Sequence, residues 1–546
     1  MKRQHWILLG GYVALIVLLS FYHEMWRDEV RALSVAIDSQ SWGAMLADLH
    51  HEGHPAVWYS ILRAGYAVTH SNLVLPVAAL ATAAAAAYVI LRFAPFPLWL
   101  RALAVFGAFL GYELSVVARN YGIGVLLLMA GCVLFRERER RPLLLAFALA
   151  LLANTSVHAA IASAIMLALW LTDLMDKKRR AGLTSLWGLA GVAIVIAGIV
   201  IAWLTARPTP DMVWGSTLSS LTLSKIARAI GIDPGKGLMG FSDANIAAVG
   251  EYPWRFIGVN SGLASRLIVD AALLWLLWSL RRNWKAIAAI VAAILSFEIV
   301  FRTIYTAGPR HEGLLLFLLF AICWVTAGND DTRVRAATRG LLPLFALQAL
   351  ALPILVNRVI KYNESSSRSY AAFITANPGY RRAILMSEPD YFMEPLRYYV
   401  SNRIYSARQN EFANRVYFGD KRANYLALWK LQDEAQRVAC QYRVPVLLAI
   451  GTRDFQANLS GSRSVAYRAT FAWTRDERAR FNAVARRVAV FPRATTDEVY
   501  EVFELTCVDQ GGLNYGSPGL DTDLTDVNGF TRIYAATLFS FLQNHK

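Results

Sequence analysis

An adjacent acid pair, Asp28 and Glu29, follows directly after an apolar N-terminal segment at residues 6–22. A carboxylate at a membrane surface is well placed to accept the proton of a hydroxyl group, and two adjacent carboxylates can also bind a divalent cation. The alternative is an amphipathic helix, "WRDEVRALSVAID", that lies on the membrane with its charged side chains in water. The acid pair is therefore the first candidate for chemistry.

Three histidines follow the acid pair in "HHEGHPAVWY", residues 50–59. His50 and His54 have the i, i+4 spacing of metal ligands on a helix, but the glutamate is not placed as in a zinc protease. Gly53 and Pro55 also interrupt the helix that such a motif requires. We therefore interpret the segment as a loop in which His54 and the nearby Tyr59 are candidate binding residues.

A second polar group lies at the outer end of a later apolar segment, in "YELSVVARNYGIGVLLL", residues 112–128. Arginine at membrane depth is costly unless it is paired or faces a polar space. Arg119 could simply pair with Glu113, or it could bind phosphate or carboxylate, because its guanidinium donors form a rigid fork. Tyr121 is a candidate binding residue beside it.

Two further outer turns carry polar side chains. "NTSVHAAIA" at 154–162 places His158 in a break between apolar runs, and "FEIVFRTIYTAGPRHEG" at 297–313 contains Arg302, Arg310 and His311. Cations at the level of lipid headgroups suit an anionic lipid. A plain polar turn and simple headgroup anchoring are the alternatives for these residues.

The composition predicts a membrane protein. The 546 residues are 56% hydrophobic, with a mean hydropathy of +0.37 and a net charge of +16. In a membrane protein such an excess of positive charge indicates cytoplasmic loops, and we find no zinc-finger spacing or RNA-binding signature, so nucleic acid is not an expected partner.

About eleven membrane spans fit the hydropathy pattern, because each helix needs roughly 20 apolar residues to cross a bilayer. The first, 6–22, is interpreted as a retained span, since no small-residue cleavage site follows it. The expected spans are 6–22, 73–93, 99–117, 121–135, 142–156, 158–175, 183–204, 263–280, 285–304, 312–327 and 340–357.

Clusters of basic residues decide the topology. "RERERR", "DKKRR", "RRNWK" and "TRVRAATR" all fall on the cytoplasmic side if the N-terminus is inside and the short segment 54–68 lies flat in the interface. Residues 1–358 then form a membrane domain with external loops at 23–72 and 205–262, and residues 359–546 form an external domain.

The C-terminal region changes pattern. "RRAILMSEP" and "RVPVLLAIGT" are typical of buried strands, and "EPLRYYVS" and "ANYLALWKLQDEAQRVAC" are typical of helices, so we expect an α/β domain. If this domain faces an oxidising compartment, Cys440 and Cys507 are expected to form a disulfide. The glycine-rich tract at 509–526 lacks the spacing of a phosphate or calcium loop and is expected to be a surface loop.

The order of these motifs resembles the GT-C class of integral-membrane glycosyltransferases, which includes protein O-mannosyltransferases and lipid A aminoarabinose transferases. Asp28-Glu29 resembles the acidic motif of the first external loop in that class. "HPAVWY" is similar to its "HPPLYY" element, with Ala56 and Val57 at the differing positions, and "ARNYGIGVLLL" is similar to its Arg-x-Tyr stretch. The resemblance is strongest over residues 20–135 and hardly reaches the C-terminal domain.

The resemblance implies transfer of a sugar from a polyprenyl-phosphate donor at the outer face of the plasma membrane. The acceptor would be a lipid, a glycan or a protein, and membrane lipids would surround the enzyme. Asp28 would be the base, and Glu29 would assist it or bind a divalent cation, the one candidate cofactor. Arg119, Arg302 and Arg310 would stabilise the departing lipid phosphate.

Two alternatives remain open at this stage. An oligosaccharyltransferase, which moves a whole glycan, resembles the same class but usually has a Trp-Trp-Asp type motif, for which "FAWTRDE" at 471–477 is a poor substitute. A lipid or solute transporter is expected to show paired broken helices or an inverted repeat, and neither is visible.

Overall fold

The computed structural model describes residues 3–207, 261–303, 309–419, 422–451, 455, 460–465 and 469–507. It divides the chain into two compact units, each assembled from segments that are distant in sequence. The first unit contains Met1–Glu24, Ser39–Trp58 and Pro76–Asn363, and the second contains Met25–Asp38, Tyr59–Leu75 and Glu364–Lys546. The second unit thus takes in parts of the first external loop, whereas the sequence predicted a single boundary near residue 358.

The first unit is helical. Its elements are α1 (Arg3–Tyr22), α3 (Trp42–Asp48), η1 (Leu49–His51), α5 (Val74–Phe93), α6 (Leu98–Val105), the π-helix η2 (Phe109–Glu113), α7 (Tyr121–Phe135), α8 (Pro142–Ala153), α9 (Val157–Leu171), η3 (Thr172–Met175), α10 (Arg180–Thr184), α11 (Leu186–Ala206), α16 (Ser261–Ser279), α17 (Trp284–Thr303), α18 (Pro309–Ala327) and α19 (Asp331–Lys361).

Seven helices among the described residues are long and apolar enough to cross a membrane. They are Arg3–Tyr22, Val74–Phe93, Val157–Met175, Leu186–Ala206, Trp284–Phe301, Arg310–Ala327 and Asp331–Lys361, and the apolar helices Tyr121–Phe135, Pro142–Ala153 and Ile268–Ser279 are shorter. These helices indicate a membrane-embedded protein. The expected number of about eleven spans stays a prediction.

Two helical segments differ from the expectation. The span expected at 99–117 is broken, because α6 ends at Val105 and is followed by the separate π-helix. The basic run at 332–339, expected in a loop, is the first part of the 31-residue helix α19, which Asp330 caps by accepting from two backbone amides. Proline at 343 and 353 is accommodated inside this helix.

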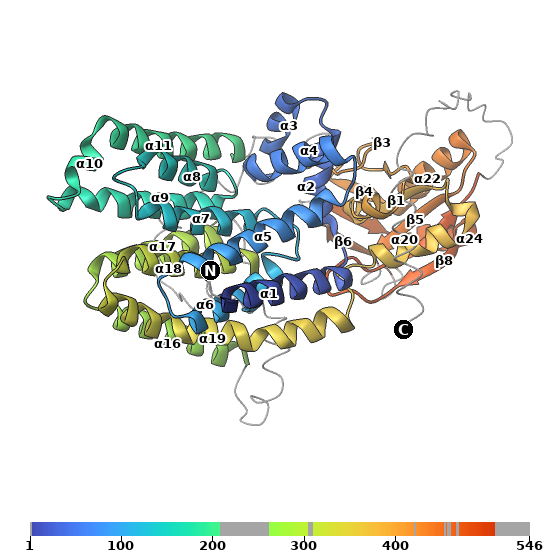
Figure 1. The fold of residues 1–546 in the computed structure, drawn as a ribbon. Coiled ribbons are helices and arrows are strands. Elements are labelled where there is room, and N and C mark those ends of the chain that lie inside the picture. The colour runs from blue at the N-terminus through green and yellow to red at the C-terminus, as the bar shows by residue number, and fades with distance from the viewer. Residues whose placement is uncertain are drawn as a thin grey trace. The chain divides into compact units, whose positions relative to one another are not determined.

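Small residues allow the helices of the first unit to pack closely. Figure 1 shows α7, α8, α9 and α11 side by side, and α8 and α11 are in extensive contact. A Cβ atom added at Gly198 on α11 would lie 2.6 Å from the Cβ of Ala150 on α8, so the two backbones approach too closely for a larger residue. This is the small-residue packing that membrane helices use in place of a hydrophobic driving force.

The second unit contains α2 (Arg27–Asp38), α4 (Val57–Thr69), α20 (Ser367–Ala376), η5 (Pro378–Tyr380), β1 (Ile384–Glu388), η6 (Asp390–Met393), α21 (Leu396–Tyr399), β2 (Tyr405–Ser406), β3 (Glu411–Phe412), β4 (Tyr425–Ala427), α22 (Leu428–Tyr442), β5 (Val446–Gly451), β6 (Gly461–Val465), β7 (Ala469–Trp473), α24 (Arg475–Val484), β8 (Arg486–Phe491) and β9 (Tyr500–Leu505). Unit boundaries fall inside α4, whose first two residues belong to the first unit, and inside α5, whose first two residues belong to the second unit.

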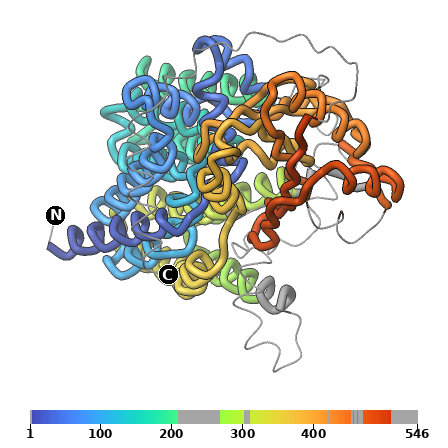
Figure 2. Tube along the Cα trace, turned by 90° about the vertical axis from the view of Figure 1, so that its right-hand side faces the viewer, coloured from blue at the N-terminus to red at the C-terminus, as the bar shows by residue number. Residues whose placement is uncertain are grey.

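The strands of the second unit form a four-stranded sheet in the order β1-β5-β9-β8, a three-stranded sheet in the order β4-β7-β6, and the pair β2-β3. β1 and β5 are the two buried strands that the apolar runs "AILMS" and "VLLAIG" predicted. They run parallel to each other, and their residues are buried on both faces. Figure 2 follows the chain through these strands, coloured from orange to red.

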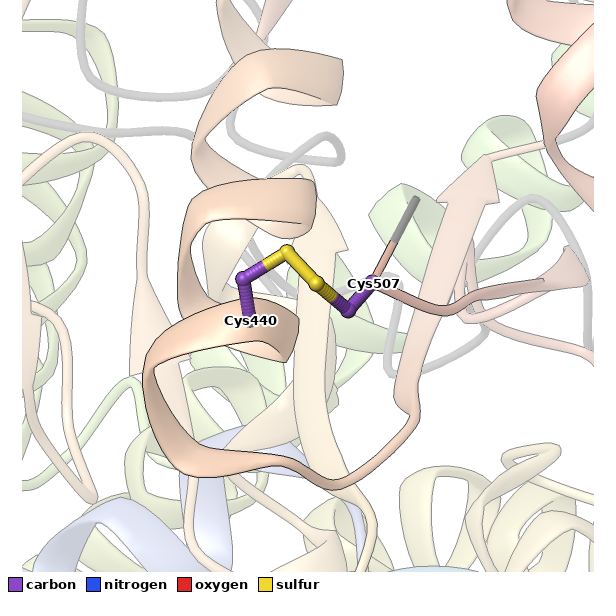
Figure 3. Close-up of a disulfide and its surroundings, with 2 residues drawn as sticks. All are labelled: Cys440 and Cys507. Carbon is purple, nitrogen blue, oxygen red and sulfur yellow. A yellow bond between two sulfur atoms is a disulfide. The ribbon is translucent and has the colours of Figure 1, made fainter. Parts of the chain in front are cut away.

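A disulfide closes this sheet onto its helix. Cys440 lies on α22, Cys507 follows β9, and the two sulfur atoms are bonded (Figure 3). The structure thus contains the predicted cross-link, while the glycine-rich tract at 509–526 lies outside the described residues.

Candidate functional site

One turn in the first unit joins three of the predicted site segments. The turn Asn154–Ser156 separates α8 from α9. The backbone N–H of Val57 donates to the carbonyl oxygen of Asn154 at 3.1 Å, and the side-chain amide of Asn120 donates to the carbonyl of Thr155 at 2.5 Å. The segments before Val57 and after Asn120 are therefore held against the start of α9.

His158 is placed by the same turn. Ser156 is the N-cap of α9, and its hydroxyl oxygen accepts from the backbone N–H of Ala159, the arrangement that stabilises a first helical turn. The break "NTS" in the apolar run is thus a helix start, as its residue types predict. His158 follows in the first turn and is buried.

His54 and Arg119 meet at this joint. Gly53 has a φ of +67°, a left-handed conformation that glycine adopts without strain, and it ends the short helix before His54. The Nη2 atom of Arg119 lies 3.3 Å from Nε2 of His54. A guanidinium group can only donate, so Nε2 of His54 accepts, and the imidazole proton lies on Nδ1.

His158, His311 and Tyr121 form an aromatic group. The rings of His158 and His311 are stacked with centroids 4.7 Å apart, and Tyr121 meets His311 edge-on at 5.2 Å. Phe297 and Phe301 on α17 complete the group at 5.2 and 5.5 Å from His158. Four helices, α7, α9, α17 and α18, thus contribute to one small region of the membrane-embedded unit.

Positive charge gathers around this aromatic group. His311 is within electrostatic range of His158, Arg310, His54 and Arg119. We call these five residues, including His311, the His–Arg cluster. Guanidinium and imidazole N–H groups are the donors that proteins use to bind phosphate and carboxylate oxygens, so the cluster can bind an anion.

Two buried acids lie on helices that contribute to the aromatic group. Glu298 on α17 and Glu312 on α18 are 6% and 5% exposed. Ionisable side chains inside membrane helices are rare and usually serve a function. Neither acid was predicted as a site residue from the sequence.

The acid pair lies in the second unit, in the first turn of α2. Glu29 is fully buried, and its carboxylate accepts from the backbone N–H of Trp26 at 3.4 Å, as the acid of a capping box does. Asp28 is different, because its side chain is 34% exposed, with one carboxylate oxygen 3.9 Å from Nε of Arg27. Glu29 therefore has a structural function, and Asp28 is the better candidate for proton transfer.

The alternative of a solvated surface helix is wrong for α2. Glu29 is buried, and the side chains of Arg27 and Arg31 are only 20% and 11% exposed. All three contact other groups of the second unit. The helix is thus packed against protein on its charged face, which its amphipathic pattern alone did not reveal.

The remaining predicted residues separate in the structure. Tyr59 is buried in α4 in the second unit, and Arg63 of the same helix donates to the carbonyl oxygen of Ala36 at 2.8 Å. α4 has 13 residues and is not among the seven long apolar helices, and the flat orientation proposed for 54–68 stays a prediction. Arg302 lies in α17, but its side chain lies outside the described residues.

His50 and His54, which have the spacing of metal ligands on a helix, contact different groups. Nδ1 of His50 lies 3.3 Å from the carbonyl oxygen of Arg207, whereas His54 contacts Arg119. Within the described ranges, no group of three or more His, Cys, Asp or Glu side chains is arranged to hold a metal ion.

Sequence reasoning missed one polar contact in the first unit. Nδ1 of His23, at the end of α1, lies 2.8 Å from the hydroxyl of Tyr112 in the π-helix, and both side chains are buried. The signal was present, since His23 precedes the acid pair and Tyr112 precedes Glu113. Neither residue type is unusual at a membrane surface, however, so only the fold shows that they meet.

We compared the chain with family models, with curated proteins and with solved structures, and none of these comparisons gives a match.

Proposed function

We propose that the protein is a membrane glycosyltransferase that moves a sugar from a polyprenyl-phosphate donor to a hydroxyl-bearing acceptor. The observation that carries the proposal is the His–Arg cluster, in which side chains from four separate segments gather within the membrane-embedded unit. Such a cluster suits a phosphate attached to a lipid, because a lipid donor reaches the site through the membrane.

The chemistry follows from the residue types. Asp28 accepts the proton of the acceptor hydroxyl, whose oxygen attacks C1 of the sugar. The bond between C1 and the phosphate oxygen breaks, and its electron pair leaves with the lipid phosphate. Arg119 and Arg310 donate hydrogen bonds to that phosphate as its charge develops. Inversion at C1 is expected for a single displacement of this kind.

The proposal requires a definite sidedness. The acid pair, the His–Arg cluster and the disulfide domain belong on the outer face of a plasma membrane, because thiols are oxidised on that side. The basic loops then lie on the opposite, cytoplasmic side. The disulfide between Cys440 and Cys507 supports this orientation. Acid pair and cluster belong to different units of the chain, so their meeting at one substrate is part of the proposal.

The test is transfer by the purified full chain in lipid nanodiscs. Polyprenyl-phosphate sugars with a radiolabelled hexose or pentose are supplied with membrane-extracted lipids, glycans and peptides as acceptors. The proposal expects labelled acceptor and free polyprenyl phosphate in equal amounts. Movement of intact donor across a proteoliposome membrane, without cleavage, would instead identify a transporter. Transfer only from lipid-linked oligosaccharides would identify transfer of a whole glycan.

A further inference from the structure

The helix that carries the acid pair is held by the C-terminal part of the chain. Arg27 donates to Asp497 at 2.5 Å, and its backbone N–H donates to Glu498 at 3.0 Å. Arg31 donates to Glu394 at 2.7 Å. Residues more than 360 positions apart in sequence thus contact each other inside one compact unit.

The two arginines flank the acid pair in sequence and are also clamped by aromatic rings. The guanidinium carbon of Arg27 lies 4.7 Å from the ring centroid of Tyr391, and that of Arg31 lies 4.2 Å from Phe418. Cation–π contacts of this kind add to the ion pairs and fix the plane of the guanidinium group. Rotation of α2 about its axis would break both sets of contacts together.

Both ends of α2 are fixed as well. Before the helix, the backbone of Met25 donates to the hydroxyl of Tyr399 at 2.8 Å and accepts from the hydroxyl of Ser367 at 2.9 Å. At the last residue of the helix, Asp38 pairs with Arg397. The helix therefore has no free end about which it could pivot.

The surface that receives α2 is itself held by buried ion pairs. Tyr391 and Glu394 belong to the loop at 388–394, which begins at the carboxyl end of β1. Two buried ion pairs hold this loop, Glu388 with Arg408 and Asp390 with Arg422, and each is formed by two hydrogen bonds of 2.7–2.9 Å. Bidentate pairs of this kind are the strongest side-chain hydrogen bonds.

The loop at 388–394 lies at the carboxyl end of the parallel strand β1. In open α/β sheets, the carboxyl ends of parallel strands usually bind the ligand. In the second unit that end of β1 leads into the loop that contacts α2. In this protein, Glu394 and Tyr391 of the loop contact arginines of α2, a helix of the same unit.

We propose that Glu394, Asp497 and Glu498 are positioning residues that hold Arg31 and Arg27 so that α2 presents Asp28 in one orientation to the substrate. This inference rests on the proposed function for its catalytic consequence, and on the contacts above for the docking itself. It gives the C-terminal domain, which the family resemblance leaves unexplained, a part in the transfer reaction.

The experiment combines kinetics with hydrogen–deuterium exchange on the full chain in nanodiscs. The double variant Glu394→Gln/Asp497→Asn removes both charges with little change in shape. We expect amides of residues 27–38 to exchange faster, and kcat to fall by about 10- to 100-fold because the base is misplaced. The KM for the lipid donor should stay within about twofold, because the donor phosphate is not bound by these residues.

A matched control lies in the same domain. Glu434→Gln removes a carboxylate that pairs with Arg437 at 2.7 Å on α22, without touching α2. It should leave both exchange and kcat unchanged. A second variant, Arg27→Lys, keeps the charge and should retain more activity than Arg27→Gln if pairing is what matters, whereas a merely folding-related defect would affect both alike.

The exchange data test the docking of α2, and kcat tests the positioning role. Unchanged exchange at 27–38 in the double variant overturns the docking, and faster exchange with an unchanged kcat overturns the positioning role. If the wild type transfers no sugar at all, the proposed function fails, and the exchange data alone then show whether the C-terminal domain holds α2. Faster exchange with a lower kcat and a steady KM supports the inference.

Discussion

Nη2 of Arg119 lies 3.3 Å from Nε2 of His54, although the two residues are 65 positions apart in sequence. The contact holds the guanidinium beside His54, and its charge acts on His311 of the stacked His158–His311 pair, inside the membrane-embedded unit. An arginine held in this way is preorganised to bind an anion, because little side-chain freedom remains to be lost on binding.

Replacing Arg119 should therefore weaken donor binding. We expect Arg119→Gln to raise the Kd for a polyprenyl phosphate by about 10- to 100-fold, since a hydrogen bond to a charged group contributes about 1.5–3 kcal/mol. Microscale thermophoresis with a fluorescent polyprenyl phosphate measures this. Arg333→Gln, which removes an exposed arginine paired with Asp330, is the control and should bind normally. Equal affinity for the wild type and Arg119→Gln would exclude the cluster as the phosphate site.

Gly122 should be essential for the geometry around Arg119. A Cβ atom at Gly122 would lie 2.5 Å from the carbonyl oxygen of Leu114, in the turn that leads to Arg119. We expect Gly122→Ala to destabilise the protein by about 1–3 kcal/mol, the usual cost of overpacking. Gly10→Ala on α1, where a Cβ has open space, should be neutral or slightly stabilising. Thermal unfolding in nanodiscs compares the two, and equal melting temperatures would contradict the prediction.

The stability of the second unit should fall as pH rises. Burial raises the pKa of Glu498 from 4.5 to about 8, although Arg27 and the hydroxyl of Ser365 oppose the shift. Because the folded-state pKa is the higher one, this stability is fully present below pH 4.5 and is lost as the pH rises to about 8. Limited proteolysis in urea at pH 5, 6.5 and 8 measures the trend.

Glu498→Gln is the corresponding control, because an amide does not titrate. Its resistance to proteolysis should be nearly independent of pH between those values. If the wild type and Glu498→Gln show the same pH dependence, another group causes it. Asp497→Asn provides the comparison, because Asp497 is the neighbouring carboxylate and is 33% exposed. The pH dependence of proteolysis in this variant should be compared with that in Glu498→Gln.

The four cysteines should fall into two classes. Cys440 and Cys507 are bonded, and Cys132 and Cys323 are free and buried in apolar helices. In native membranes we expect no alkylation of any of them without reductant, and alkylation of 440 and 507 after reduction. Reduction should destabilise the second unit by about 2–4 kcal/mol. Labelling of 440 and 507 without reductant would contradict the external orientation.

The sequence predicted the helices and strands of this fold better than it predicted which of them pack together in one compact unit. The apolar runs give helices at almost every expected position, and "AILMS" and "VLLAIG" form the parallel strands β1 and β5, since period and length determine such elements locally. The attachment of α2 to the C-terminal domain was not predicted. It depends on contacts such as Arg31 with Glu394, which no local pattern encodes.

The candidate site was predicted in part for the same reason. His54, Arg119, Tyr121, His158, Arg310 and His311 were each identified by residue type, and the structure brings them together through the Asn154–Ser156 turn. The capping function of Glu29 was missed, because the first turn of a helix and a catalytic acid pair have the same sequence appearance.

The central claim, that Asp28 is the base for transfer from a lipid phosphate, is tested most directly by Asp28→Asn in the purified full chain. We predict that this variant binds polyprenyl phosphate with wild-type affinity, while its turnover falls by about 10²- to 10⁴-fold, the usual contribution of a general base. Asp48→Asn, an acid that accepts from Ser39 at 2.9 Å, is the control and should turn over normally. Wild-type turnover by Asp28→Asn would contradict the account.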